Sequence, residues 1–247
     1  MTKLIFLFFS LLFTSILVQG QVKIHSHNDY THQKPFYDAV KNKAFSIEAD
    51  IFVVGDSLFV AHSKAEIKNG NTLKKMYLAP IEVLSKTDEF YSFQLMIDVK
   101  DRWELTYPVL LKALKPYQQL FLKGHKKVII AISGSRPAAS TFHNYPVFFN
   151  FDGLPNVVYT PVNLKRVTMI SDDFETYSKW NGVGEISATD KATLSLLINN
   201  AHRIGKPFRF WGAPDTEACW KLLHGLGADI INTDKVSEVT KFFKTGI

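Results

Sequence analysis

Hydrophobic and polar residues follow two different periods along this chain, and together they predict short strands that alternate with helices. Strand-like patterns are expected at 22–27, 46–53, 58–62, 93–99, 127–133, 167–171, 207–211 and 229–233. Helical spacing of apolar residues is expected at 35–44, 108–121, 194–204, 216–226 and 236–244. Strongly apolar strands that alternate with helices are typical of a parallel sheet.

The pattern weakens only in the middle third of the chain. Residues 134–166 contain Gly, Pro, Asn and aromatic residues without a helical period, and 157–162 is the strand candidate there. About eight strands over this length favour a single closed (β/α)8 barrel of the TIM type, irregular in its middle third. An open doubly wound sheet usually carries a Gly-rich phosphate-binding turn after its first strand, and this chain has none there.

The first twenty residues form a separate unit. Lys3 is followed by an almost continuous apolar run over 4–18 and then by Gly20, which is the order of a secretory signal peptide. We therefore expect 1–20 to be a signal peptide, 21–247 to be the barrel domain, and the protein to be secreted or periplasmic. No membrane span is expected after cleavage, and the single cysteine, Cys219, excludes an intrachain disulfide.

The charge is modestly positive, with 29 Lys and Arg against 23 Asp and Glu. These basic residues are spread along the whole chain, whereas nucleic-acid-binding proteins concentrate them on one face. We therefore expect no nucleic-acid partner, and no obligate protein partner is evident. A small anionic ligand remains compatible with the charge.

Polar side chains occur where the predicted strands end. Three pairs share a strand face because their members are two residues apart: His25 with His27, Glu48 with Asp50, and Asp98 with Lys100. Further polar or aromatic candidates near strand ends are Asn28, His62, Arg136 and Trp211. The carboxyl ends of barrel strands converge on one rim, so these groups are expected to share one site.

The residue types at these positions indicate a chemistry. The carboxylates Glu48, Asp50 and Asp98 are hard oxygen ligands that suit Mg²⁺ or Ca²⁺ better than Zn²⁺. Histidines on separate elements can act as general acid and general base near neutral pH. Lys100 and Arg136 can neutralise a phosphate group.

Several motifs also resemble a known family. The segments HSHNDY (25–30), SIEAD (46–50), LFVAH (58–62) and LMIDVK (95–100) are similar to the phospholipase C-like phosphodiesterases of TIM-barrel fold. That superfamily includes glycerophosphodiester phosphodiesterases and phosphatidylinositol-specific phospholipases C. The likeness is strongest to a poorly characterised branch that includes a fungal protein named for altered inheritance of mitochondria. RFWGAPD (209–215) and GADIINTD (227–234) look like the last two strands of the family.

The resemblance implies roles for individual residues. His25 matches the catalytic histidine of the first strand, and His62 matches the second catalytic histidine. Glu48 and Asp50 match the metal-binding pair, while Asp98 stands where the family usually has a glutamate. The chain departs from the glycerophosphodiesterase pattern after His25, where Arg-Gly and a Pro-Glu-Asn-Thr box are missing. The resemblance therefore implies phosphodiester chemistry without specifying glycerophosphodiesters.

The predicted function is a metal-dependent phosphoric diester hydrolase, or a cyclising phosphodiesterase, that acts on a lipid- or polyol-derived phosphodiester. The expected substrate-binding residues are His27, Asn28, Lys100, Arg136 and Trp211. One alternative is a metal hydrolase of the amidohydrolase or polymerase-histidinol-phosphatase type, which needs histidine ligands on later strands as well. Another alternative is a non-catalytic barrel that binds a phosphate-containing ligand.

Overall fold

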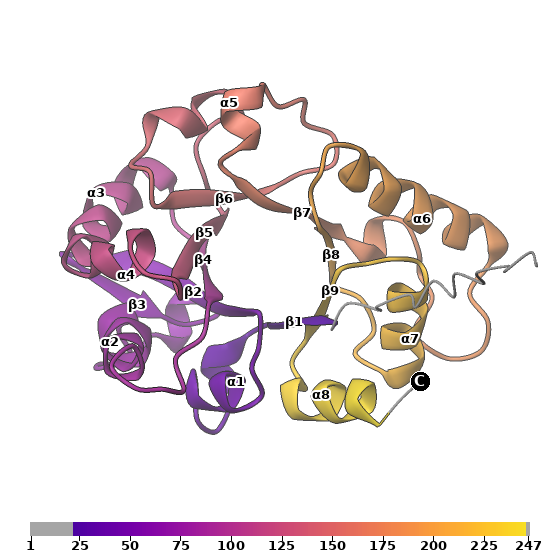
Figure 1. The fold of residues 1–247 in the computed structure, drawn as a ribbon, viewed down its shortest axis with the longest axis horizontal. Coiled ribbons are helices and arrows are strands. Elements are labelled where there is room, and N and C mark those ends of the chain that lie inside the picture. Colours follow the sequence, from indigo (N-terminus) through magenta and orange to yellow (C-terminus); the bar gives the residue numbers. More distant parts are fainter. Residues whose placement is uncertain (1–21, 246–247) are drawn as a thin grey trace, which may run out of the picture.

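The computed structural model describes residues 22–245, and eight parallel strands within it form a closed barrel (Figure 1). The predicted signal peptide lies outside the described residues. The barrel strands are β1 (Lys23–Ser26), β2 (Ser46–Val54), β4 (Phe93–Val99), β5 (Val128–Gly134), β6 (Phe149–Gly153), β7 (Val167–Asp173), β8 (Phe208–Trp211) and β9 (Ile230–Thr233). The expected single (β/α)8 barrel is thereby confirmed.

The first strand closes the barrel because it pairs on both sides. His25 lies opposite Ser46 of β2 and opposite Asn232 of β9, both in parallel register. A further strand, β3 (Ser57–Val60), folds back antiparallel on β2 and stays outside the ring. The strand expected at 58–62 is therefore the second arm of a hairpin.

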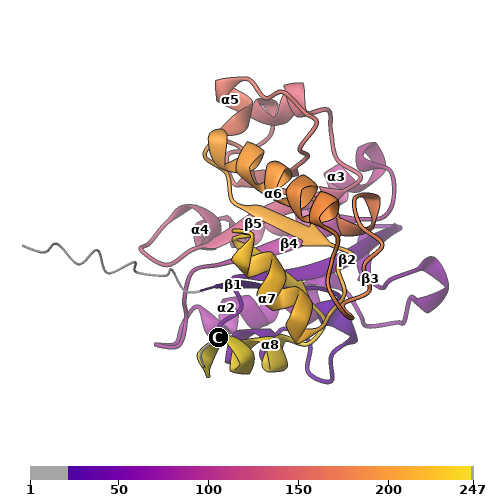
Figure 2. The same ribbon diagram turned by 90° about the vertical axis from the view of Figure 1, so that its right-hand side faces the viewer.

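Helices surround the barrel (Figures 1 and 2). They are α1 (Tyr37–Lys41), α2 (Ala79–Leu84), α3 (Trp103–Leu114), α4 (Gln118–Leu122), α5 (Pro161–Leu164), α6 (Ala188–Arg203), α7 (Glu217–Gly225) and α8 (Val236–Lys244). Single short turns, such as η1 (Asp29–Thr31) and η5 (Ala139–Asn144), join several of them to the strands.

The middle third is irregular, as expected, but its strand lies at Phe149–Gly153 and not at the predicted residues. Residues 157–160 form a loop, and Val158 is 98% exposed, so the predicted strand at 157–162 is wrong. The strand is β6, in which Phe149 and Phe151 are fully buried. The crossover from β6 to β7 carries only the short helix α5, which explains why no helical period was found there.

The helix expected at 108–121 is also different in the structure. Helix α3 begins earlier, at Trp103, and contains Pro108 in its second turn. The helical stretch is then interrupted before α4, at Lys115 and Pro116. A proline has no N–H and disturbs the preceding turn, so the chain changes helix type at Pro116.

The barrel interior is filled in layers. At the bottom, Met96, Met169 and Ile230 from three separate strands form a small buried cluster. Above it lies what we call the deep layer, formed by His25, Glu48, Asp152, Ser171, Arg209 and Asn232. The rim layer, at the carboxyl ends of the strands, is formed by His27, Asp50, His62, Asp98, Lys100 and Asp234.

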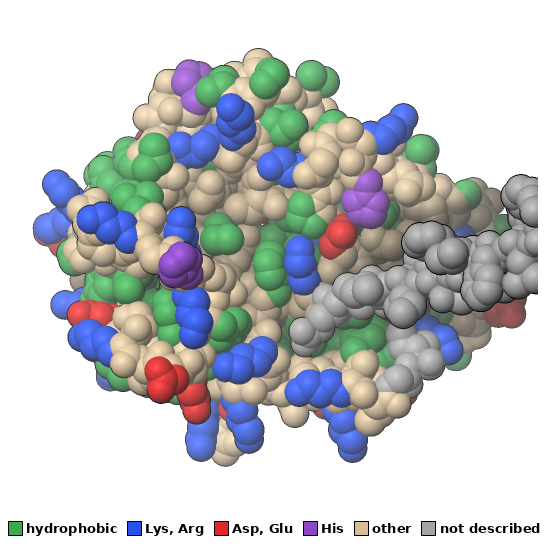
Figure 3. Space-filling model, viewed as in Figure 1, with side chains coloured by type: hydrophobic (Ala, Val, Ile, Leu, Met, Phe, Trp, Pro, Cys, Tyr) green, Lys and Arg blue, Asp and Glu red, His purple; other side chains and the backbone are tan. Residues whose placement is uncertain are grey.

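Figure 3 shows the opposite end of the barrel, where the strands begin. Lys and Arg side chains are spread around this face and are not gathered in one patch (Figure 3). Within residues 22–245, no helix combines the length and the apolar character that a membrane crossing requires.

Candidate active site

Three carboxylates meet inside the barrel, two from β2 and one from the carboxyl end of β4. Glu48 and Asp50 lie on the same face of β2, and the parallel register places Asp50 opposite Asp98 of β4. One ligand oxygen from each carboxylate lies within 4.8 Å of the other two. The expected carboxylate cluster is therefore present in the fold.

Lys100 binds two members of this cluster. Its Nζ lies 2.8 Å from Oδ2 of Asp50 and 2.5 Å from Oδ2 of Asp98. Burial opposes the charge of this ammonium, but the two carboxylates outweigh burial and raise the pKa of Lys100. The lysine side chain is 28% exposed, so a charged amine remains accessible at the rim.

Asp50 carries the feature that best indicates a cation-binding role. Its Oδ2 accepts hydrogen bonds from Tyr30 and Lys100, whereas its Oδ1 is buried and has no hydrogen-bond partner among residues 22–245. Burial and the neighbouring Glu48 raise the pKa of Asp50 to about 7. A buried, unpartnered oxygen within a set of three carboxylates fits a hard divalent cation such as Mg²⁺ or Ca²⁺.

The two histidines of β1 lie at different depths. His25 is 0% exposed, and its two ring nitrogens contact Ser46 Oγ at 2.8 Å and Glu48 Oε2 at 2.6 Å. Burial, followed by the charge of Arg209, lowers the pKa of His25 well below its ordinary value. The histidine that the sequence predicted to be catalytic therefore belongs to the deep layer and has no ring nitrogen facing solvent.

His27 lies one layer higher, on the rim. Its side chain is 30% exposed, and Nδ1 lies 2.8 Å from Oδ1 of Asp234 at the end of β9. Burial lowers the pKa of His27, but the hydrogen bond with Asp234 and the charges of Glu48 and Asp234 together outweigh burial and raise this pKa. The contact occupies Nδ1 and leaves Nε2 as the free ring nitrogen.

His62 reaches the rim through the β2–β3 hairpin. The Ala61 amide donates a hydrogen bond of 3.2 Å to the carbonyl of Asp50, which fixes the chain just before His62. The ring is 64% exposed, and its Nδ1 lies 3.7 Å from Oδ2 of Asp50 and 3.3 Å from the Tyr30 hydroxyl. His62 therefore borders the acidic cluster with an accessible ring.

Asn28 also reaches the rim. It has a left-handed backbone with φ of 45°, and its amide nitrogen lies 3.0 Å from Nδ1 of His27. Its Oδ1 accepts a hydrogen bond of 2.9 Å from Tyr30. The asparagine thus joins His27 to the residues around Asp50.

Arg136 and Trp211 are further from the cluster. Arg136 follows β5 and lines a cavity of about 400 Å³, together with Gly134 and Tyr159. Gly134 has φ of +65°, and a Cβ there would lie 2.7 Å from Oδ1 of Asp98, so a glycine is required for this close approach. Trp211 ends β8 and is 42% exposed. Among the described residues, no hydrogen bond joins Arg136 or Trp211 to the three carboxylates.

Sequence reasoning missed three residues of the site. Asp234 and Tyr30 contact the two rim histidines, and Arg209 contacts Glu48 from inside the barrel. Asp234 directly follows the last strand, so the strand-end rule could have found it. Arg209 lies on the same face of β8 as Trp211. Its partner Glu48 is 161 residues away in sequence, so no local pattern indicates their contact.

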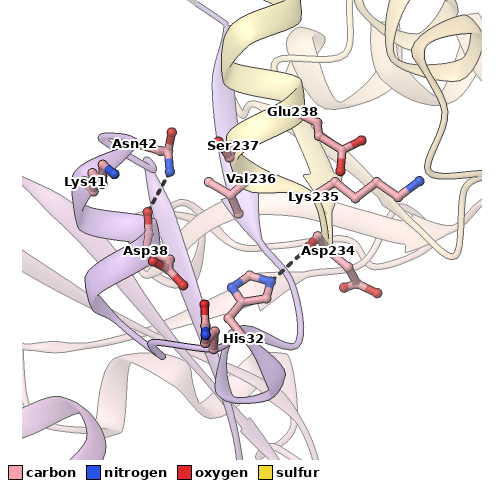
Figure 4. A pocket seen from close by; sticks show the side chains of 10 residues that line it. His32, Asp38, Lys41, Asn42, Asp234, Lys235, Val236, Ser237 and Glu238 are labelled. Atoms are coloured by element: carbon pink, nitrogen blue, oxygen red, sulfur yellow. Dashed lines mark hydrogen bonds between the residues drawn. The ribbon is translucent and has the colours of Figure 1, made fainter.

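A second cavity adjoins the rim at Asp234 (Figure 4). It has a volume of about 350 Å³ and lies between the segment from η1 to α1 and the start of α8. His32 closes one side, where its Nε2 donates a hydrogen bond of 2.9 Å to the Asp234 carbonyl. Asp234 is therefore held by His27 through its carboxylate and by His32 through its backbone.

Comparisons with known proteins agree with this fold. The AIM6-like phosphodiesterase domain matches residues 16–127, and the glycerophosphoryl diester phosphodiesterase family matches residues 207–237. The Altered inheritance of mitochondria protein 6 homolog of Arthroderma benhamiae is 25% identical, over 90% of this chain and 84% of the relative.

Two solved structures share the fold. A glycerophosphodiester phosphodiesterase from Parabacteroides distasonis has a TM-score of 0.60 and 14% identity, with 91% of this chain and 97% of that chain covered. A calcium-dependent phosphoinositol-specific phospholipase C from Pseudomonas has a TM-score of 0.56 and 13% identity, with 89% and 90% covered. These matches confirm the resemblance that the sequence indicated: the chain is similar to the AIM6-like phosphodiesterases and shares its fold with phospholipase C-like TIM barrels.

Proposed function

We propose that the chain is a divalent-cation-dependent phosphoric diester hydrolase or cyclising phosphodiesterase. One observation carries the proposal: three carboxylates with a buried, unpartnered oxygen on Asp50 lie beside two accessible histidines, His27 and His62. A phosphodiester bound at the carboxylates would lie within reach of an acid and a base. In the deep layer both ring nitrogens of His25 are occupied, so that layer offers no accessible histidine.

The cation site would consist of Glu48, Asp50 and Asp98. Mg²⁺ and Ca²⁺ are the ions that such oxygen ligands prefer, and the Pseudomonas neighbour is described as calcium-dependent. When bound, the cation supplies Lewis-acid stabilisation of the charge that develops on the phosphate oxygens. Lys100, which binds Asp50 and Asp98, adds a second positive charge at the same place.

His27 is the residue we assign as general base. With its Nδ1 donating to Asp234, the ring presents an unprotonated Nε2 that can take a proton from the attacking hydroxyl. Asp234 fixes the tautomer and stabilises the imidazolium that results. We favour His27 over His25, to which the family resemblance assigns the role, because both ring nitrogens of His25 are occupied in the deep layer.

His62 is the residue we assign as general acid. As the new P–O bond forms, the bond to the leaving group breaks, and Nε2 of protonated His62 delivers its proton to the leaving oxygen. The proton taken up by His27 balances this transfer. When the nucleophile is a neighbouring hydroxyl of the substrate, the product is a cyclic phosphate, and when it is water, the product is a monoester.

The substrate is proposed to be a lipid- or polyol-derived phosphodiester. The names of the neighbours support this class, since one acts on glycerophosphodiesters and the other on phosphoinositols. Asn28 and Arg136 would bind polar parts of the substrate, and the exposed ring of Trp211 would contact its apolar part. The zinc-dependent alternative has less support, because the candidate metal group within residues 22–245 contains no histidine.

The test is turnover of a chromogenic bis-phosphodiester and of a panel of glycerol and inositol phosphodiesters, with Mg²⁺ or Ca²⁺ added. We expect wild-type turnover that disappears with a chelator and falls at least a hundredfold in His27→Ala and His62→Ala. His125→Ala is the matched control, because His125 is exposed and lies outside the site. A wild-type protein that is inert with every diester and both cations would refute the proposal.

A further inference from the structure

Arg209 occupies an unusual position, inside the barrel and below the candidate cation site. It is 3% exposed and lies on β8, opposite Ser171 of β7. Its guanidinium extends across the interior to four other strands. The partners are Ser171 Oγ at 3.1 Å, Asn232 Oδ1 at 3.1 Å, Asp152 Oδ2 at 3.3 Å and Glu48 Oε2 at 3.5 Å.

The contact with Glu48 is the one that concerns the site. The same oxygen, Oε2, also accepts the hydrogen bond of 2.6 Å from His25. Arg209 and His25 thus hold one oxygen of Glu48 from two sides, at 7% exposure of the residue. One carboxylate oxygen of Glu48 lies within 4.8 Å of ligand oxygens of Asp50 and Asp98.

The planar fork of arginine is required for this arrangement. Its N–H groups point in fixed directions, so one side chain can bind Asp152, Ser171 and Glu48 at the same time. A lysine ammonium has three donors on a flexible stem and no such fixed geometry. Asp152 and Ser171 also bind each other, at 2.7 Å, which anchors the far side of the guanidinium.

We propose that Arg209 is a positioning residue for the cation site: it fixes Glu48 so that one carboxylate oxygen points toward Asp50 and Asp98. This inference rests on the proposed function, because the cation is part of that function. According to this inference, Arg209 strengthens cation binding, although its positive charge alone would weaken it. A positive charge near a cation site weakens binding by repulsion, whereas a correctly held ligand strengthens it.

The experiment measures cation binding directly, by isothermal titration of CaCl₂ or MgCl₂ into the purified protein without substrate. We expect Arg209→Met to weaken the affinity for the preferred cation at least tenfold. Arg209→Lys, which keeps the charge without the fork, is expected to recover only part of this loss. Arg166→Met is the matched control, because Arg166 binds the backbone carbonyl of Phe149 near the start of β6, and we expect unchanged cation affinity.

A double-mutant cycle separates positioning from general loosening of the barrel. In a Glu48→Gln background, Arg209→Met is expected to cause no further loss of cation affinity, because its effect passes through Glu48. An equal loss in both backgrounds would overturn the inference, and so would unchanged or tighter binding in Arg209→Met alone. If Arg209→Met does not fold, Arg209→Lys is taken through the same cycle.

The outcomes distinguish this inference from the proposed function. A wild-type protein that binds and turns over substrate, while Arg209→Met binds the cation equally well, refutes only the role of Arg209. A wild-type protein that binds neither cation refutes the cation site and the role of Arg209 together.

Discussion

The deep layer and the rim layer of the barrel are built from the same residue types but differ in how their polar atoms are used. In the deep layer, Glu48 binds both His25 and Arg209. Arg209 is 3% exposed and His25 is 0% exposed. In the rim layer, two histidine rings are accessible and Oδ1 of Asp50 has no partner. Along a strand the two layers are two residues apart, as His25 and His27 are at the end of β1.

This difference separates two roles for similar side chains. Buried polar groups with all contacts satisfied contribute to a defined fold, and removing one partner leaves the others unpaired. Groups with free atoms at an accessible rim can instead bind a ligand or move a proton. We therefore expect substitutions of the two rim histidines to reduce activity and substitution of the buried His25 to reduce stability.

The largest expected effect is that of His27→Ala on turnover. Loss of a general base lowers kcat by 10²- to 10⁴-fold, and about 1,000-fold is expected here. The free energy of unfolding should change little, because the ring is partly exposed. Steady-state kinetics together with urea unfolding check both parts, and a protein that keeps wild-type kcat would remove His27 from the mechanism.

The second effect is that of His25→Ala on stability. The change removes one buried partner from each of Glu48 and Ser46 and creates a cavity, so a loss of about 3 kcal/mol is expected. Urea unfolding monitored by tryptophan fluorescence measures it, with the exposed His125→Ala as control. Unchanged stability combined with lost activity would return the catalytic role to His25 and break the distinction between the layers.

The third effect tests whether Asp234 supports His27 within the rim. Asp234→Asn keeps the size of the side chain but removes the charge that stabilises the imidazolium, and a reduction of kcat by about 30-fold is expected. KM should change less than kcat, since Asp234 acts through His27. The double variant with His27→Ala should be no slower than His27→Ala alone, and additive losses would contradict this role.

The smallest effect concerns His32, on the outer side of Asp234. The carboxylate of Asp29, 3.5 Å from Nδ1 of His32, raises the pKa of His32 above 6.5 in the folded protein. The resulting stabilisation is complete below pH 6.5 and is lost as the pH rises through the folded pKa. Wild type should therefore exceed His32→Gln in unfolding free energy by more at pH ~5.5 than at pH ~8.5. An equal difference at both pH values would show that His32 acts by packing alone.

The sequence predicted the barrel and the carboxylate cluster because both follow from local rules. Polar residues at the ends of apolar strands, as in Glu48 and Asp50, indicate a rim once the sheet is known to be parallel. The strand β6 was missed because its aromatic residues lie among loop-forming residues, and burial of Phe149 and Phe151 became apparent only in the folded barrel.

The depth of each residue could not be predicted in the same way. His25 and His27 share one face of β1, and alternation shows the face without showing the level. The depth of each histidine in the barrel depends on which residues of β2 and β9 lie opposite it. That pairing register is known only from the structure. The role of Arg209 depends on a contact across the barrel, which leaves no local pattern in the sequence.

The β2–β3 hairpin has a consequence for the evolution of this site. His62 is placed by the pairs between Ile51 and Val60 and between Val54 and Ser57, and by the amide of Ala61. The turn at Gly55 and Asp56 lies beyond these pairs and takes no part in placing the histidine. Insertions and deletions at that turn would therefore be tolerated, and homologous chains could differ in length there while the histidine keeps its place. A single-residue deletion inside β3 would instead shift His62 to the other face of the strand.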